Sequence, residues 1–188
     1  MVYLLVLLAA VFSFSAVARA ELNLTPRLEE YEGDGVKFTH LVFSDGEKHP
    51  TYNPPAGWEY SGSAKQLTLR PKSKAQADAI ISASKVEKPL AFDEPGIKSY
   101  TDEVLATVPG GATDASLVST QLNPLRMDGR ETLLVVIKYK AYGQAFARSV
   151  LILNRATEQV RFQFTAREAD FKDLQSAFLH SLFTWDGM

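Results

Sequence analysis

The fold of this chain is decided by residues 132–165, TLLVVIKYKAYGQAFARSVLILNRATEQVRFQFT. Apolar and polar side chains alternate along two parts of this stretch, and a period of two is typical of β-strands. The apolar members of the two alternating runs are Leu133, Val135, Ile137, Tyr139, Ala141, Val160, Phe162 and Phe164. The connections at Gly143 and at residues 154–158 are too short for a crossover helix, so the pattern predicts antiparallel neighbouring strands.

Further strands are predicted on both sides of this stretch. Four strands in all are expected within Ala115–Thr165, and three more over Val36–Phe43, Gln66–Arg70 and Ala79–Val86. Three prolines between residues 49 and 57 exclude a regular helix or a central strand there. The strands outnumber the helices, and their short connections predict a mainly antiparallel sheet.

Two amphipathic helices are predicted to cover that sheet. At about 100° per residue, five large apolar residues between 170 and 185 share one stripe. They are Phe171, Leu174, Phe178, Leu182 and Trp185. A shorter helix is predicted over Tyr100–Val108, with Ser99 as its N-cap and Pro109–Gly111 as its end. Because burial stabilises by about 1.5–3 kcal/mol per large side chain, the C-terminal helix is expected to be essential to the fold.

Residues 1–20 have the pattern of a signal peptide. An apolar run, Val2–Phe12, is followed by small residues at Ala18 and Ala20, which predicts cleavage before Glu21. We therefore expect export, either to the periplasm or out of the cell. The alternative is an uncleaved N-terminal anchor, because the run approaches the roughly 20 apolar residues that span a bilayer. No Lys or Arg precedes the run, which departs from the usual signal-peptide pattern.

The rest of the chain predicts one domain. Residues 21–35 are interpreted as an acidic lead-in with solvated charges, and residues 36–188 as a single α+β domain without an internal repeat or linker. The absence of cysteine excludes thiol catalysis and thiolate metal sites, and it suits an oxidising compartment. The 20 basic and 22 acidic residues leave no basic excess, and the basic ones are scattered, so no nucleic-acid partner is expected.

Three short motifs accompany this order of elements. Pro55–Trp58 follows an extended segment, Met127–Arg130 lies between two strands, and Asp170–Phe171 opens the final helix. Together they resemble the PsbP-like family over roughly Val36 to Trp185. The resemblance implies an antiparallel β-sheet flanked by helices on both faces, an α/β/α sandwich of the α+β class, and docking or assembly rather than catalysis. Members of this family serve different partners, so the resemblance identifies no partner.

Two groups of side chains are candidate sites. Asp45, Glu47 and His49 alternate in one turn, and two carboxylates with an imidazole are ligands that Zn²⁺ or Mn²⁺ accepts. The other interpretation of this turn is a solvated polar loop. No other cofactor is expected, because the glycine pairs of the chain lack the context of a phosphate loop. No serine-hydrolase motif is present either.

The second group is aromatic. Tyr52, Trp58 and Tyr60 lie beside prolines, where aromatic rings form binding shelves for a partner or ligand. The alternative is that Trp58 simply closes the core, since most tryptophans are largely buried.

Three functions are compatible with these patterns. The first is an exported, non-catalytic binding or scaffold module that docks to an envelope or secreted protein through an exposed apolar or aromatic patch. The second is a carrier that encloses a small apolar ligand between the sheet and the helix over residues 171–185. The third is a metal-dependent enzyme that uses the loop of Asp45, Glu47 and His49.

Overall fold

The computed structural model of this 188-residue chain describes residues 21–187. The strands in this range are β1 (Asn23–Gly33), β2 (Val36–Ser44), β3 (Thr51–Tyr52), β4 (Trp58–Ser63), β5 (Gln66–Pro71), β6 (Asp78–Lys85), β7 (Thr113–Leu122), β8 (Thr132–Ala141), β9 (Gln144–Asn154) and β10 (Glu158–Arg167). The helices are α1 (Glu94–Ala106), α2 (Glu168–Ser181) and the short 3-10 helix η1 (Leu182–Thr184). The predicted signal peptide, residues 1–20, lies outside the described residues.

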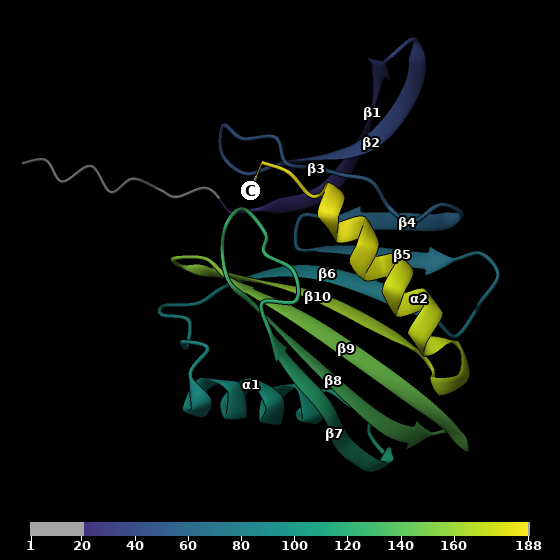
Figure 1. The fold of residues 1–188 in the computed structure, drawn as a ribbon, viewed down its shortest axis with the longest axis vertical. Coiled ribbons are helices and arrows are strands. Elements are labelled where there is room, and N and C mark those ends of the chain that lie inside the picture. The colour runs from purple at the N-terminus through teal and green to yellow at the C-terminus, as the bar shows by residue number, and fades with distance from the viewer. Residues whose placement is uncertain (1–20, 188) are drawn as a thin grey trace, which may run out of the picture.

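Seven strands form one sheet in the order β4-β5-β6-β10-β9-β8-β7 (Figure 1). Strands β7 to β10 pair antiparallel in chain order, which confirms the four strands predicted within Ala115–Thr165. The three strands predicted earlier in the chain are present as β2, β5 and β6. Tyr142 and Gly143 join β8 to β9 with φ of 52° and 73°, as a tight hairpin turn with matching twist requires.

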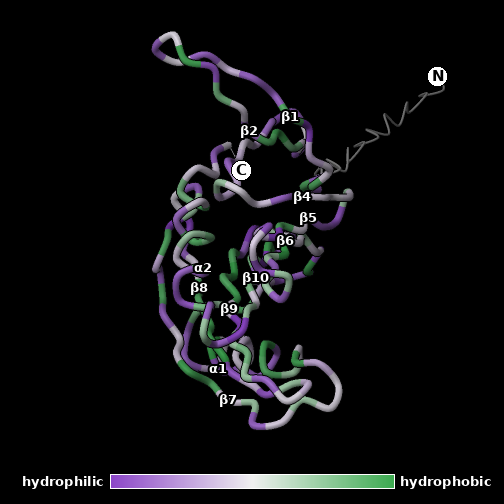
Figure 2. The backbone as a smooth tube through the Cα atoms, turned by 90° about the vertical axis from the view of Figure 1, so that its right-hand side faces the viewer, coloured by the Kyte–Doolittle hydropathy of each residue, from purple (hydrophilic) through white to green (hydrophobic). Residues whose placement is uncertain are grey.

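Helices cover both faces of this sheet, and each face has its own core. Helix α2 packs over β9 and β10 on one face, where the buried residues include Phe162 and Phe164. The predicted apolar stripe is confirmed, since Phe171, Phe178, Leu182 and Trp185 are buried and Leu174 packs against them. Helix α1 packs over β7 and β8 on the other face, against the alternating apolar residues of β8. Figure 2 shows the hydrophobic stretches of the central strands between the two helices.

Helix α1 begins six residues before the predicted start at Tyr100, so Ser99 is not its N-cap. The cap is Asp93, whose Oδ1 accepts a hydrogen bond of 2.9 Å from the amide of Gly96. Pro95 is compatible with this start because the amides of the first helical turn have no acceptor within the helix, so the missing N–H of proline costs no hydrogen bond. The pair Pro95 and Gly96 is typical of turns, which is why the sequence pattern placed the start too late.

Arg148 on β9 attaches the end of α1 to the sheet. Its Nη1 donates to the carbonyl of Thr107, the C-cap of α1, at 2.6 Å, and its Nε donates to Oγ1 of Thr165 on β10 at 3.0 Å. The last turn of α1 contains no basic residue. Arg148 therefore supplies from the sheet the positive charge that stabilises the C-terminal end of a helix dipole.

The acidic segment that precedes residue 36 forms strand β1, to which the sequence analysis assigned no secondary structure. β1 pairs antiparallel with β2, and β2 pairs with β3, in a separate three-stranded sheet. The start of β1 lies along the edge strand β4, where the amide of Leu24 donates to the carbonyl of Ala64 at 3.0 Å. Gly62 permits this approach, because a Cβ there would lie 2.6 Å from Cδ of Pro26. The far end of the β1–β2 hairpin extends beyond the body (Figures 1 and 2).

The chain thus has the predicted α+β architecture, an antiparallel sheet with one helix on each face. None of the helices described within residues 21–187 is long and apolar enough to cross a membrane.

Candidate functional site

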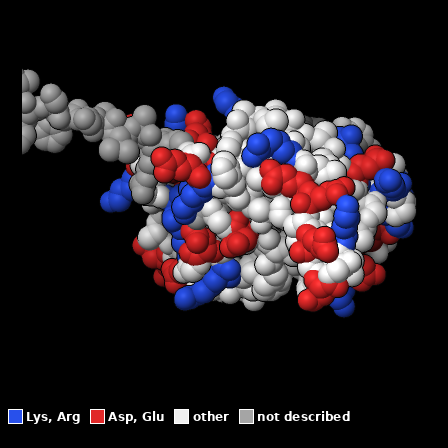
Figure 3. Space-filling model, turned by 90° about the horizontal axis from the view of Figure 1, so that it is seen from above, with Lys and Arg blue, Asp and Glu red and all other residues white. Residues whose placement is uncertain are grey.

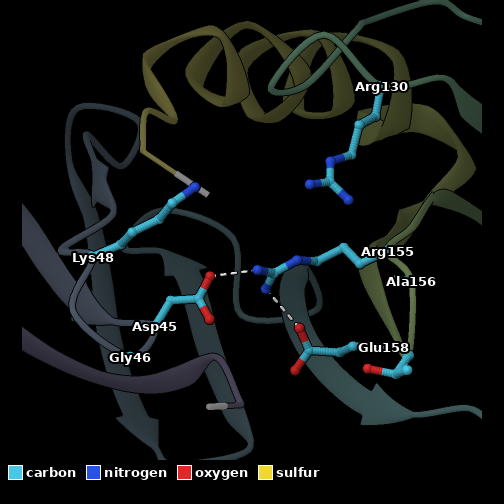
Figure 4. A pocket seen from close by; sticks show the side chains of 8 residues that line it. Asp45, Gly46, Lys48, Arg130, Arg155, Ala156 and Glu158 are labelled. Carbon is cyan, nitrogen blue, oxygen red and sulfur yellow. Dashed lines mark hydrogen bonds and ion pairs between the residues drawn. The ribbon is translucent and has the colours of Figure 1, made fainter. Parts of the chain in front are cut away.

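A polar pocket lies at the base of the β1–β2 hairpin, where three loops meet (Figure 4). The turn after β2 contributes Asp45 and Lys48, the turn between β9 and β10 contributes Arg155, and the loop before β8 contributes Arg130. Its volume is about 250 Å³. The pocket therefore lies where the small sheet meets the large one.

Arg155 is the centre of this pocket. Its Nη1 donates to Oε2 of Glu158 at 2.7 Å, and its Nη2 forms a short ion pair with Oδ2 of Asp45. The side chains of Asp45 and Glu158 are only 5% and 9% exposed, and that of Arg155 is 16% exposed. Three charged groups are thus largely removed from water, and the shared guanidinium group offsets part of the charge of the two carboxylates.

The same cluster attaches the start of β1. The second carboxylate oxygen of Glu158, Oε1, accepts a hydrogen bond of 3.1 Å from the amide of Leu22. Asp45 is held in its turn by reciprocal backbone hydrogen bonds with Lys48, of 3.0 and 3.2 Å. The cluster therefore ties both strands of the hairpin, at their base, to the turn between β9 and β10.

The predicted metal ligands are not brought together with a further ligand. Asp45 is 8% exposed and faces Arg155, whereas Glu47 and His49 are exposed at the surface. Within residues 21–187, no group of three or more His, Cys, Asp or Glu side chains has the arrangement of a metal site. Asp45, one of the two carboxylates of the predicted set, is already held by the guanidinium group of Arg155.

The predicted aromatic residues do not form one shelf. Tyr52 is fully buried, and its hydroxyl lies 2.8 Å from Oγ of Ser181 at the end of α2. Burial raises the pKa of Tyr52 far above its ordinary value, against a smaller lowering by the hydrogen bond with Ser181. Trp58 is partly buried and stacks on Phe178, in agreement with the alternative that it closes the core. Only Tyr60, at 40% exposure, is accessible to a partner.

A different aromatic surface appears on the β1–β2 hairpin. Tyr31 of β1 lies opposite Phe38 of β2, and its ring stacks on Phe38 at 5.4 Å and on His40 at 4.8 Å between centroids. Val36, opposite Gly33, continues the same face because opposite residues of an antiparallel pair share a face. Tyr31, Phe38 and Val36 are 41%, 43% and 52% exposed. We call Tyr31, Val36, Phe38 and His40 the aromatic face of the hairpin.

Acidic residues lie on both faces of the hairpin: Glu29 shares the aromatic face opposite His40, and Glu30 and Glu32 point to the other face. Glu29 and Glu30 have cationic neighbours, with Arg27 at 3.8 Å and Lys37 at 3.9 Å respectively. Glu32 and Asp34, nearer the tip, have no ion pair among residues 21–187. The hairpin tip is therefore net negative. On the face of the molecule in Figure 3, acidic and basic side chains are otherwise interspersed.

A second polar cluster lies at the opposite end of the sheet. Asp78 of β6, Thr165 of β10 and Arg148 of β9 are neighbours across three strands. Partial burial raises the pKa of Asp78, and the positive charges of Arg148 and Arg70 lower it less. Burial likewise raises the pKa of Tyr139, whose hydroxyl lies 3.4 Å from Nη2 of Arg148. This cluster supports α1 rather than lining the pocket of Arg155.

Most of these residues were not predicted from the sequence, for different reasons. Asp34-Gly35 is a hairpin signal that could have indicated a strand before Val36, although the apolar residues Leu24, Leu28 and Tyr31 do not alternate. The ion cluster has no comparable signal. Asp45 and Arg155 are 110 positions apart in the sequence, and only the packing of the two sheets brings them together.

Known proteins resemble this chain only distantly. No family model matches this chain, and no curated protein matches it. The solution structure of cyanobacterial PsbP from Synechocystis sp. PCC 6803 is similar, with 12% identity and a TM-score of 0.48 over 95% of this chain and 99% of that one. A protein of unknown function, PA94 from Pseudomonas aeruginosa, has 11% identity and a TM-score of 0.42 over 83% and 94%. A protein from Bacteroides thetaiotaomicron VPI-5482 has 12% identity and a TM-score of 0.46 over 74% and 45%. All three TM-scores lie below 0.5 at 11–12% identity, so these structures are distant similarities only.

Proposed function

We propose that this chain is a non-catalytic binding module, exported to the periplasm or out of the cell, that docks a protein partner through the aromatic face of the β1–β2 hairpin. Export is supported by the apolar run Val2–Phe12 and the small residues Ala18 and Ala20. Docking is supported by one observation above all. Stacked aromatic rings are exposed on a hairpin that extends from the body.

The aromatic face has the properties of a binding surface. Exposed apolar groups rimmed by polar ones mark interaction sites, because covering them with a partner removes apolar area from water. Tyr31 is held between Phe38 and His40, so its ring loses little further conformational freedom when a partner binds. The ion cluster at the hairpin base keeps the face in place relative to the large sheet.

The charge of the hairpin tip indicates the kind of partner. Glu32 and Asp34 lie near the tip without an ion pair among the described residues. A matching protein surface therefore has an apolar groove bordered by Lys or Arg. An anionic membrane surface is disfavoured as the target, because it would repel these carboxylates.

The carrier alternative has less support. The space between α2 and the sheet, where an apolar ligand was predicted to bind, is filled by the buried rings of Phe162, Phe164, Phe178 and Trp185. The rings of Phe164 and Phe178 lie 6.0 Å apart between centroids. Close packing of this kind leaves a ligand no room without displacing the core.

The enzyme alternative also lacks a site in the described range. Asp45 is engaged with Arg155, and Glu47 and His49 are solvent-exposed. An enzyme would need polar groups that converge on a cleft around a reacting atom. The convergent groups of the pocket, Asp45, Arg155 and Glu158, instead form ion pairs with one another.

Selection from a random peptide library displayed on phage would test the proposal. We expect the purified protein, residues 21–188, to enrich peptides that combine apolar residues with Lys or Arg. A double variant, Tyr31→Ser with Phe38→Ser, should bind these peptides at least about 30-fold more weakly, since loss of a central aromatic contact costs about 2 kcal/mol or more.

The matched control replaces exposed apolar residues of similar size elsewhere. Leu117→Ser with Val118→Ser on β7 removes side chains that are 45% and 55% exposed, and it should leave peptide binding unchanged. Thermal melts of all three proteins would verify that each is folded. Equal binding by the hairpin variant, or a library that yields no enrichment, would exclude the aromatic face as the docking surface.

A further inference from the structure

We infer that the pocket at the base of the hairpin binds an oxyanion, a carboxylate or phosphate group, between Arg130 and Arg155. This inference goes beyond the docking function and does not depend on the aromatic face. It rests on the hydrogen-bond donors of the two guanidinium groups, on their arrangement and on the size of the pocket.

Arg155 has donors left over after its ion pairs. A guanidinium group carries five N–H donors in a planar fork. One Nη1 proton is donated to Glu158 and one Nη2 proton to Asp45. No other acceptor for Arg155 is present among residues 21–187, although its side chain is only 16% exposed. No nitrogen of Arg155 is buried without a partner in the described range, so its remaining donors are accessible from the pocket and can donate to an anion there.

Arg130 is weakly engaged. Its one ionic neighbour in the described part of the chain is Asp128, at 3.7 Å from Nε, which is beyond hydrogen-bonding distance. Figure 4 shows its guanidinium group directed into the pocket, on the opposite side of Arg155 from Glu158. An anion entering on the side of Arg130 would therefore meet both guanidinium groups and would avoid the carboxylate of Glu158.

Arg130 is a positive group of the wall that the wall's own carboxylates do not hold. Asp45 and Glu158 are both paired with Arg155, and Arg130 is paired with neither. The hydroxyl of Thr157 also lines the pocket and can donate a further hydrogen bond.

The geometry selects the class of ligand. Planar guanidinium groups recognise carboxylate and phosphate groups through paired N–H donors, and they do so most strongly where water is partly excluded. A volume of about 250 Å³ accommodates one such group with a small substituent, and not a nucleotide. Carboxylate and phosphate groups share this chemistry, so the test must separate the two anion types.

The experiment is a titration of the protein, residues 21–188, with sodium phosphate and separately with sodium acetate. Ionic strength is held constant with sodium chloride, so that screening does not change. Binding is followed by NMR, through the backbone amides of Gly46, Ala156 and Thr157 and the Nε–H signals of arginine. We expect saturable shifts at these positions with at least one of the two anions and a Kd in the millimolar range.

The variant Arg130→Gln should weaken this binding at least about tenfold, since a charge-assisted hydrogen bond is lost. Arg130 is 41% exposed on its side chain and outside both cores, so the variant should remain folded. Arg27→Gln removes a cation of 60% exposure on the hairpin and is the matched control, with binding expected to be unchanged.

Each outcome decides the question. Saturation by phosphate alone assigns a phosphate site, and saturation by acetate alone assigns a carboxylate site. Shifts that never saturate, or that are equal in Arg130→Gln and the unmodified protein, would overturn the inference. The double variant Tyr31→Ser with Phe38→Ser should retain anion binding, so a failure of the docking proposal can be distinguished from a failure of the anion site.

Discussion

Replacement of Arg155 by methionine would reveal how much the ion cluster contributes to the fold. Arg155→Met leaves the carboxylates of Asp45 and Glu158, which are 5% and 9% exposed, without their shared cation. Removing one partner from a buried ion pair costs about 3–5 kcal/mol, because the remaining charge stays desolvated and unpaired. The glutamate would retain only the amide of Leu22 as a donor from the described residues.

The expected loss is large enough to measure in two ways. For a domain of this size, 1 kcal/mol lowers the melting temperature by about 2–4 °C, so we expect a decrease of roughly 6–20 °C. Urea unfolding followed by circular dichroism should show the same loss in the free energy of unfolding, with an unchanged slope against urea if the variant remains two-state.

Two further variants test the reasoning. Asp45→Asn and Glu158→Gln added to Arg155→Met remove the unpaired charges, and they should restore much of the lost stability. Lys98→Met breaks an exposed pair with Asp102, whose side chains are 77% and 59% exposed, and should cost no more than about 0.5 kcal/mol. If Arg155→Met destabilised as little as Lys98→Met, the cluster would not be the attachment of the hairpin that the geometry indicates.

Three other changes have clear expected outcomes. Asp78→Asn should stabilise the protein at neutral pH more than at acid pH: burial raises the pKa of Asp78, so the unmodified protein loses stability as the pH rises from the unfolded value through the folded one. Urea unfolding at both ends of that window would measure it, and an equal effect at both would contradict the assigned burial. Gly62→Ala should destabilise by about 1–3 kcal/mol, because its Cβ would lie 2.6 Å from Cδ of Pro26 and 2.8 Å from the carbonyl oxygen of Leu24; an unchanged thermal melt would show that β1 does not press on β4. Tyr142→Asn should raise the melting temperature, since Tyr142 has φ of 52° with 89% exposure and asparagine is favoured in this turn; a decrease would indicate that the tyrosine makes contacts of its own.

The architecture of the large sheet was predictable from local patterns. The period of two in β8 and β10 and the helical stripe from Phe171 to Trp185 report burial directly, because apolar side chains recur wherever one face meets the core. The start of α1 was not predictable in the same way. Pro95 and Gly96 are typical of turns, and only the hydrogen bond from Gly96 to Asp93 places them within the helix.

By itself, the sequence determined the class of the fold, the neighbouring antiparallel strands and the covering C-terminal helix, because these depend on spacing along the chain. Only the tertiary structure decided the candidate sites. Arg155 meets Asp45 across 110 positions, and Tyr52, predicted as part of an aromatic binding shelf, is buried beneath the end of α2. Such contacts depend on how two sheets and a helix pack in space, and the side chains near a residue in the sequence carry no information about partners so far away in the chain.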